Sequence, residues 1–516
     1  MIPRRFALLA ALAAALAGCH DEEFVTVVSN PPTGFWEPSS ATGLTGFDEE
    51  IGAADVGSDG QPRLVFKRTA GSNIQILFTR RTAAGTWTTP LLLSADDADA
   101  KTSIQAFVTT SNDFTHVFWL EASQVHYARV NNADPPALDQ SDVMISAASA
   151  SELVSAVDRV SQTVFAMWIE AAGGASVPVV CEVPAAGPVG SPVSLVIPSG
   201  GLPTCSSPLL RVSSAGVVHA AWVGTDAAGV NSLLRYAQRA SAGSWTASPG
   251  EAVSDATGNG VAQADLLLAA DGDVYAVWYD TTTDSILADR RPSGGAFGTD
   301  VTVKDYTAAP PVSLRAALEP GTEILHVIWR EGSAGGPVSW LAQRNDAADL
   351  GGNWLASDEP IHTVTTVSGD SVDFEAWADS TNRVVVAYQA PSVAGDLSRT
   401  WVRIHESKGA SFGTAKDLTV SYALPCRGLS VAANGSGTAL VVWEQGNGDD
   451  IPLSDVCGAV YASGGGMGGG ANISGSAAFP SRAPFALRMT DAGVGHVFWH
   501  ERTAPDLSDI GYARTK

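Results

Sequence analysis

The stretch LLLAADGDVYAVWYD, residues 266–280, joins two apolar runs through a short turn of aspartate and glycine. Related motifs recur along the chain: HVFW at 116–119 and 496–499, HVIW at 326–329 and HAAW at 219–222. Short runs of Val, Ile, Leu and aromatic residues bounded by Gly, Asp and Asn are typical of β-strands joined by tight turns. The stretch therefore predicts a β-hairpin, and its recurrence predicts an internal repeat.

Each repeat contains the same sequence of four short strands. When the copies are aligned on the aromatic residue of the second strand, nine appear, spaced about 54 residues apart. The aromatic positions are Phe66, Trp119, Trp168, Trp222, Trp278, Trp329, Tyr388, Trp443 and Trp499. A third strand often ends in a motif such as HYAR (126–129). A fourth strand opens with Gly-x-Trp or Gly-x-Phe, as in GSW (243–245). Four strands per unit at this period predict the blades of an all-β propeller.

The two ends of the chain predict how the ring closes. The sequence stops at Lys516, before the ninth copy reaches a fourth strand, and an unmatched GFW lies at 34–36. We expect this N-terminal segment to complete the last blade, so that residues 34–516 form a single closed β-propeller of about nine four-stranded blades. The alternative is eight blades with one copy displaced, because the copy around Tyr388 is the least typical.

Residues 1–18 are expected to be a signal peptide, since Arg4 and Arg5 precede a short apolar stretch. Leu16-Ala17-Gly18-Cys19 resembles the lipobox of bacterial lipoproteins. The resemblance implies cleavage before Cys19, lipid on its thiol, and a polar tether over 19–33. It also implies a place in the cell envelope, in the outer membrane because His20 follows the cysteine, with the lipid as the only membrane contact. An ordinary signal peptide is the other interpretation.

Four further cysteines suit an exported protein with two disulfide bonds. Their spacing pairs Cys181 with Cys205, and Cys426 with Cys457. No two of them have the CxxC spacing of a zinc site, so cysteine-bound zinc is not expected.

The charge of the chain limits its partners. With 54 acidic and 30 basic residues, the formal net charge is −24, which disfavours nucleic acid as a partner. Divalent cations remain possible ligands. The loop QGNGDDIPLSD (445–455) gathers Asn447, Asp449, Asp450 and Asp455, whose oxygens are of the kind that bind calcium. A solvated turn is the alternative, and no other cofactor is expected.

The recurring histidines are predicted to be structural. His116, His219, His326 and His496 lie three residues before the aromatic, where other copies have Arg63, Phe165 or Val385. Blades arranged around a ring cannot bring these four together on one metal ion. The aromatic row is predicted to be core between blades. The acid that follows it, as in Glu121, is expected to pair with an arginine on the third strand, as in Arg129. A cation–π contact of that arginine with the aromatic residue is the alternative.

In the repeat, a Gly/Asp turn is followed by HVFW, HVIW or VYAVW and then by YAR. This order of motifs resembles the repeats of exported sialidase-like, or BNR-type, β-propellers. That group includes sialidases with an arginine triad, a Tyr–Glu pair and an Asp-box, and no clean Asp-box occurs in this chain. No catalytic residue is therefore assigned. Two functions remain open: a non-enzymatic propeller that binds a glycan, peptide or envelope protein, and a divergent glycan hydrolase. The hydrolase predicts two or three carboxylates and an arginine directed at one axial pocket, and the binding protein predicts no convergent acid pair there.

Overall fold

A computed structural model gives the fold of the protein. It describes residues 36–40, 48–109, 113–196, 204–225, 232–240, 243–246, 250–254, 260–306, 311–332, 338–345, 350–364, 373–391, 397–406, 410–420, 424–446, 454–474, 481–504 and 507–515. The signal segment 1–18, Cys19 and the tether 19–33 lie outside these residues. Every regular element in the described ranges is a strand. None of them contains a helix with the length and apolar character needed to span a membrane.

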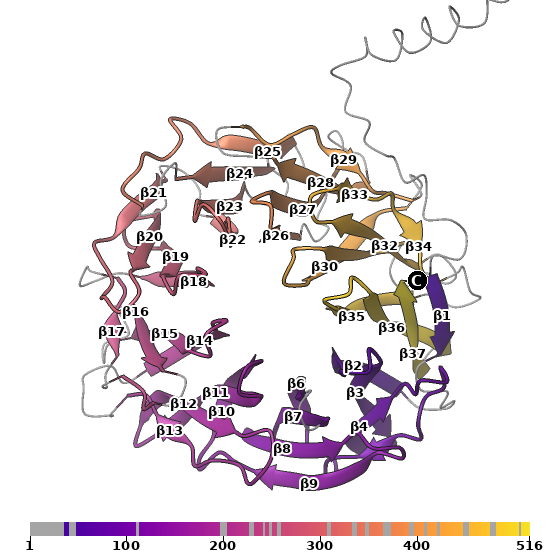
Figure 1. Ribbon diagram of the computed structural model, residues 1–516. Helices are drawn as coiled ribbons and strands as arrows, with labels where there is room; N and C mark the ends of the chain where they lie inside the picture. Colours follow the sequence, from indigo (N-terminus) through magenta and orange to yellow (C-terminus); the bar gives the residue numbers. More distant parts are fainter. Residues whose placement is uncertain are drawn as a thin grey trace, which may run out of the picture.

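Within the described ranges the strands form nine antiparallel blades around a ring (Figure 1). The first strand of each blade is innermost. The inner strands are β2 (Asp48–Val56), β6 (Lys101–Thr109), β10 (Ala150–Asp158), β14 (Thr204–Val212), β18 (Val261–Leu268), β22 (Pro311–Leu318), β26 (Phe374–Ala378), β30 (Cys426–Ala433) and β35 (Ser481–Met489). We number the blades one to nine in this order.

The second strands carry the aromatic row. They are β3 (Pro62–Ala70), β7 (Phe114–Glu121), β11 (Thr163–Ala172), β15 (Val218–Thr225), β19 (Val274–Asp280), β23 (Leu325–Gly332), β27 (Val384–Pro391), β31 (Ala439–Gln445) and β36 (Gly495–Ala504). The third strands are β4 (Asn73–Arg80), β8 (Gln124–Asn131), β12 (Ala175–Val183), β16 (Ser232–Arg239), β20 (Ser285–Arg291), β24 (Val338–Arg344), β28 (Ser398–His405), β32 (Asp455–Ala462) and β37 (Leu507–Thr515).

The outer strands are short and lie at the rim of the ring. They are β5 (Leu91–Leu92), β9 (Ala137–Met144), β13 (Val193–Ser194), β17 (Glu251–Ala252), β21 (Val301–Asp305), β25 (Glu359–Val364), β29 (Lys416–Asp417), β33 (Gly466–Met467) with β34 (Ala471–Asn472), and β1 (Trp36–Ser40). The Gly-x-aromatic motif precedes several of these strands. Its aromatic residue forms an isolated β-bridge with a residue at the end of the third strand, as Trp245 does with Arg239.

The N-terminal strand closes the ring, as the sequence predicts. β1 pairs antiparallel with β37, from Trp36 opposite Thr515 to Ser40 opposite Gly511. Blade nine therefore takes its outer strand from the opposite end of the chain. The eight-blade alternative is wrong, because the copy around Tyr388 forms its own blade of β26 to β29.

The core lies between neighbouring blades. Trp329 of blade six packs in one apolar cluster with Tyr275 and Val277 of blade five, and Trp168 of blade three shares a cluster with Trp222 of blade four. Tryptophan side chains of the row are buried, and the predicted inter-blade core is confirmed. Because each large ring removes much apolar surface from water, these contacts are a major source of stability.

The expected contact between the acid and the third-strand arginine is wrong. Glu121 lies at the exit end of β7, whereas Arg129 on β8 pairs with His116 near the entry end. The carboxylate of Glu121 instead accepts a hydrogen bond from the indole N–H of Trp119 at 2.7 Å. The acid thus satisfies a buried donor of the aromatic row.

The four cysteines are buried free thiols, and neither expected disulfide is present in the structure. Cys181 and Cys205 belong to one apolar cluster, yet Cys181 Sγ lies 3.3 Å from the carbonyl oxygen of Gly190. Cys426 and Cys457 belong to another cluster. Burial raises the pKa of Cys181 to about 12 and that of Cys205 to about 11. Thiolates are the reactive form, so burial opposes oxidation at these positions.

Candidate functional site on the inner strands

The predicted calcium loop is described only in part. Asn447, Asp449 and Asp450 lie outside the described residues. Asp455 begins β32 and accepts a hydrogen bond from Ser474 Oγ at 3.4 Å. The calcium hypothesis therefore stays a prediction.

In three blades the recurring histidine bonds a tyrosine of its own third strand. The Nδ1 atom lies 2.9 Å from the hydroxyl group in the pair His116–Tyr127, 2.7 Å in His219–Tyr236 and 2.9 Å in His496–Tyr512. These histidines are buried and belong to three different blades, as expected for structural residues. Burial, with Arg129 adding to it, lowers the pKa of His116 to about 3.

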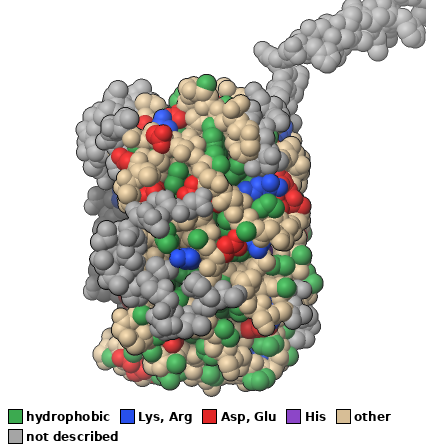
Figure 2. All heavy atoms as spheres, turned by 90° about the vertical axis from the view of Figure 1, so that its left-hand side faces the viewer, with side chains coloured by type: hydrophobic (Ala, Val, Ile, Leu, Met, Phe, Trp, Pro, Cys, Tyr) green, Lys and Arg blue, Asp and Glu red, His purple; other side chains and the backbone are tan. Residues whose placement is uncertain are grey.

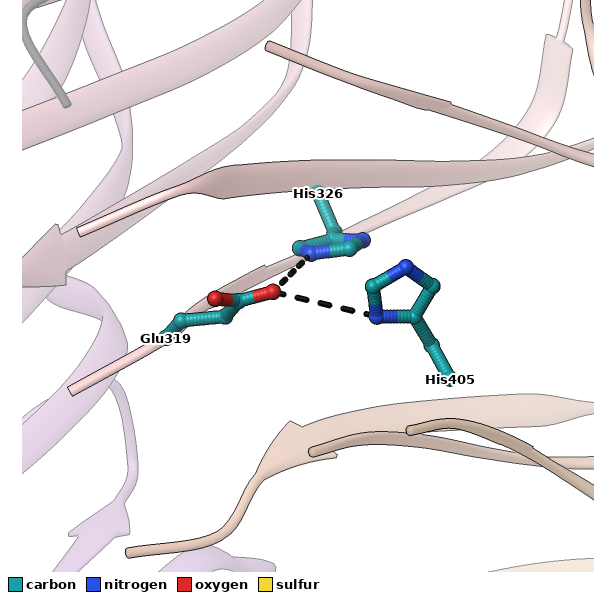
Figure 3. A group of neighbouring side chains, drawn as sticks. All are labelled: Glu319, His326 and His405. Carbon is teal, nitrogen blue, oxygen red and sulfur yellow. Dashed lines mark hydrogen bonds and ion pairs between the residues drawn. The ribbon is translucent and has the colours of Figure 1, made fainter. Parts of the chain in front are cut away.

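His326 has a different environment. It contacts Glu319 from the turn of its own blade and His405 from β28 of the next blade, and all three side chains are buried (Figure 3). Sequence reasoning missed Glu319 and His405. A signal was present, because the third strand that follows HVIW has Ala342 where the other histidine-bearing blades have Tyr127, Tyr236 or Tyr512.

The inner strands of blades four to seven carry a row of alternating charges. Its members, which we call the axial row, are Arg211 on β14, Asp265 on β18, Arg315 on β22 and Glu375 on β26. Arg211 Nη2 lies 3.6 Å from Asp265 Oδ1. Arg315 donates from Nε and Nη2 to the two oxygens of Glu375, at 3.1 and 3.2 Å. Each contact crosses from one blade to the next.

The axial row is accessible to solvent. The exposed fractions of the four side chains, in chain order, are 49%, 23%, 42% and 36%. Both guanidinium groups also donate to the carbonyl oxygen of the preceding residue, at 3.1 Å for Arg211 and 3.0 Å for Arg315. Their orientation is therefore fixed at two points. A ligand that reaches these exposed side chains meets polar groups that are already in place.

Electrostatics distinguish the two acids of the axial row. Burial raises the pKa of Asp265 above its ordinary value, and Arg211 only partly opposes this effect. Glu375 accepts two hydrogen bonds from Arg315, an arrangement that stabilises a carboxylate anion. Burial thus favours the neutral form of Asp265, whereas Arg315 holds Glu375 by two charged hydrogen bonds.

Another charged contact at the ring axis has a different character. Asp55 on β2 is buried and accepts from the backbone N–H of Val108 at 2.8 Å. Arg488 of blade nine and Arg159 lie 3.1 and 3.4 Å from its two oxygens. This carboxylate is fully engaged by the protein, so it links blades and has little capacity left for a ligand.

A groove also lies on the outer side of the ring, between blades three and four. Its volume is about 540 Å³, and its lining includes Glu182, Arg239 and Trp245. Arg239 Nη2 and Glu182 Oε2 lie 2.7 Å apart and bridge the two blades. Figure 2, which shows the side of the ring that is on the left in Figure 1, has acidic and basic side chains scattered among apolar and uncharged ones. Among the described residues on this side, the negative charge is not gathered into one patch.

No protein-family model matches the chain, and no curated protein matches it. Among solved structures, the polysaccharide lyase Uly1 is 9% identical, covers 90% of this chain and 89% of its own, and has a TM-score of 0.46. The GH93 α-L-arabinofuranosidase of Fusarium graminearum is 10% identical, with coverages of 71% and 93% and a TM-score of 0.36. The NanB sialidase from Streptococcus pneumoniae is 8% identical, with coverages of 93% and 94% and a TM-score of 0.32. Likenesses this weak carry no activity over to this chain.

Proposed function

We propose that the protein is an envelope-anchored binding propeller that holds a glycan at the ring axis. The observation that carries the proposal is the axial row, whose two guanidinium groups and two carboxylates alternate along the inner strands of four consecutive blades. The four inner strands follow one another around the ring (Figure 1) and all four side chains are partly exposed, so one extended ligand can contact several of them.

The chemistry of the axial row suits a polyhydroxylated ligand. Guanidinium and carboxylate groups are planar forks that donate or accept hydrogen bonds in pairs. Neighbouring hydroxyl groups of a sugar ring offer matching donors and acceptors. Positive and negative charges balance within the row, so it does not select strongly for an anion. The net charge of −24 further disfavours a polyanion such as nucleic acid.

Binding of glycans to the purified chain tests this proposal. A panel of envelope glycans and peptidoglycan fragments is screened by thermal shift, and the strongest ligand is titrated by calorimetry. Arg315→Gln should weaken binding about 10- to 100-fold, since it removes hydrogen bonds from a charged donor. Arg403→Gln is the matched control, because Arg403 lies on β28 and donates to the carbonyl oxygen of Pro360 away from the row. Equal affinity of the two variants and the unmodified chain would contradict the proposal.

A second candidate, glycan hydrolysis, is favoured by the two carboxylates and two arginines of the axial row, the kind of residue set that a hydrolase is expected to have at the axis. The raised pKa of Asp265 suits a proton donor, and the ion-paired Glu375 suits its anionic partner. In this case the unmodified chain cleaves the glycan that it binds, and Asp265→Asn abolishes cleavage while binding persists. A bound glycan that stays intact through prolonged incubation argues for binding alone.

Anchoring by lipid on Cys19 is part of the proposal and has its own test. In a bacterial host that processes lipoproteins, Cys19→Ser should move the protein from the membrane fraction to a soluble fraction. Retention of this variant in the membrane would contradict lipid anchoring, whatever the glycan experiments show.

A further inference from the structure

Glu319, His326 and His405 form a compact buried cluster between blades six and seven (Figure 3). Glu319 Oε1 lies 2.8 Å from His326 Nε2 and 3.8 Å from His405 Nδ1. The imidazole rings meet edge to face, with centroids 4.7 Å apart. Each of the three side chains is at most 1% exposed. One carboxylate and two imidazoles thus converge where water is excluded.

Glu319 departs from the pattern of the repeat. It opens the turn after the inner strand β22, and most other blades have a short polar residue at this position, such as Asp158, Ser213 and Asn434, or a small residue, Gly57 or Ala269. The short polar side chains bond their own turn, as Asp158 Oδ1 does with the backbone N–H of Val160. The longer side chain of Glu319 reaches His326 instead.

At the boundary between blades seven and eight, the equivalent positions form an ordinary hydrogen bond. There, Asp379 of blade seven accepts a hydrogen bond from the hydroxyl group of Tyr461 of blade eight, at 2.8 Å. This contact joins positions equivalent to those of Glu319 and His405. Asp379, like Glu319, follows the inner strand of its blade. Tyr461, like His405, lies at the end of the part of the third strand that pairs with the second strand. At the boundary between blades six and seven, an imidazole therefore replaces the hydroxyl donor.

His405 is left with an unpaired nitrogen that faces the carboxylate. Its Nε2 lies 3.0 Å from the carbonyl oxygen of Ala410, an acceptor, so Nε2 carries the proton. In the neutral ring Nδ1 then has a lone pair, and within the described part of the chain this atom has no hydrogen-bond partner. Its distance of 3.8 Å from Glu319 Oε1 is too long for a hydrogen bond. Two electron-rich atoms thus face one another in a buried site, which is unfavourable unless a cation lies between them.

The surroundings hold the ligand atoms in place. Thr322 Oγ1 donates to the second oxygen of Glu319. Arg344 donates to the same carbonyl oxygen of Ala410 that accepts from His405, at 2.7 Å. Outer contacts of this kind orient the ligands of metal sites.

We propose that Glu319, His326 and His405 bind a divalent transition-metal ion of the zinc class, which joins blades six and seven. Two imidazole nitrogens and one carboxylate oxygen are a ligand set that zinc accepts. Ligands of tetrahedral zinc lie about 3.4 Å from one another when each is about 2.1 Å from the ion. The observed separations of 2.8 and 3.8 Å bracket this value. The ion supplies positive charge for the carboxylate and a partner for the free lone pair of His405.

Titration with Zn²⁺ alone tests the site and does not depend on the glycan proposal. The full chain is stripped with a chelator, dialysed and titrated by calorimetry, and its thermal melting is recorded with and without Zn²⁺. We expect one ion per chain and a raised Tm. Glu319→Gln and His405→Gln should weaken binding by more than about tenfold, since each removes a ligand.

His219→Gln is the matched control, because His219 is buried at the same strand position as His326 but its ring bonds Tyr236. It should bind Zn²⁺ as the unmodified chain does. Cobalt supplies a readout that needs no variant: Co²⁺ bound to the unmodified chain should give visible absorption bands of nitrogen and oxygen ligands without a thiolate band. No uptake of Zn²⁺ or Co²⁺ by the stripped chain would overturn the proposal, as would unchanged binding by folded Glu319→Gln and His405→Gln variants.

Discussion

The histidine three residues before the blade aromatic shows how one residue type takes different partners in one fold. In blades two, four and nine it bonds a tyrosine of its own blade. In blade six that tyrosine is absent, and His326 bonds Glu319 instead. The structural interpretation made from the sequence holds for the tyrosine-bonded histidines. It fails to anticipate the cluster around His326, because His405 comes from another blade and no spacing in the chain connects them.

The tyrosine-bonded histidines predict how stability depends on pH. Burial, with Arg291 adding to it, lowers the pKa of His219 to about 4, against about 6.5 in the unfolded chain. The unfolded state therefore binds more protons between these values, and the free energy of unfolding falls as the pH drops from about 6.5 to about 4. His219 should contribute up to about 1.4 kcal/mol per pH unit in this window.

His219→Gln checks this expectation, because an amide can keep the bond to Tyr236 but does not titrate. Urea unfolding of both chains is measured from pH 7.5 down to pH 4.5, as far as the ring stays folded. The variant should lose less stability than the unmodified chain as the pH falls. Parallel pH profiles for the two chains would show that His219 is not held neutral in the folded state.

At the level of strands, the repeated motifs of the sequence predict the positions of most strands. The hairpin of inner and second strand recurs in every blade, since alternating apolar residues and a glycine or aspartate turn specify it locally. The outer strands were harder to foresee, because several comprise only two residues. The charges of the axial row were missed for a different reason. Asp265, Arg315 and Glu375 occupy equivalent inner-strand positions in successive blades, yet they share no residue type that an alignment of copies would reveal.

Removal of β1 tests its role in closing the ring. A chain that begins at residue 41 lacks β1, the outer partner of β37, and leaves that side of β37 as an open edge apart from the single pairing of Ser508 with Asp48. The lost backbone hydrogen bonds amount to a few kcal/mol, on the order of 1 kcal/mol each, so Tm should fall by several degrees and oligomers should form. A chain that begins at residue 34 is the control and should resemble the full chain. Equal melting temperatures and monomeric behaviour for both would mean that β1 is dispensable.

For the whole molecule, the sequence predicts the number of blades, the direction of the ring closure and the inter-blade core, since all three follow from the repeat. It does not predict which side chains meet at the ring axis or at a blade boundary. Those contacts join residues from separate blades, such as Arg211 with Asp265 and Glu319 with His405. They depend on how the blades are packed side by side, which the pattern within a single repeat does not specify.

Hydrogen exchange of the full chain with its strongest glycan ligand shows whether the glycan binds to the axial row. Exchange is followed by mass spectrometry with and without the ligand. We expect slower exchange in the inner strands β14, β18, β22 and β26, where the axial row lies, and little change in the outer strands. Protection confined to the outer groove around Glu182, Arg239 and Trp245, with the four inner strands unchanged, would show that the glycan does not bind to the axial row.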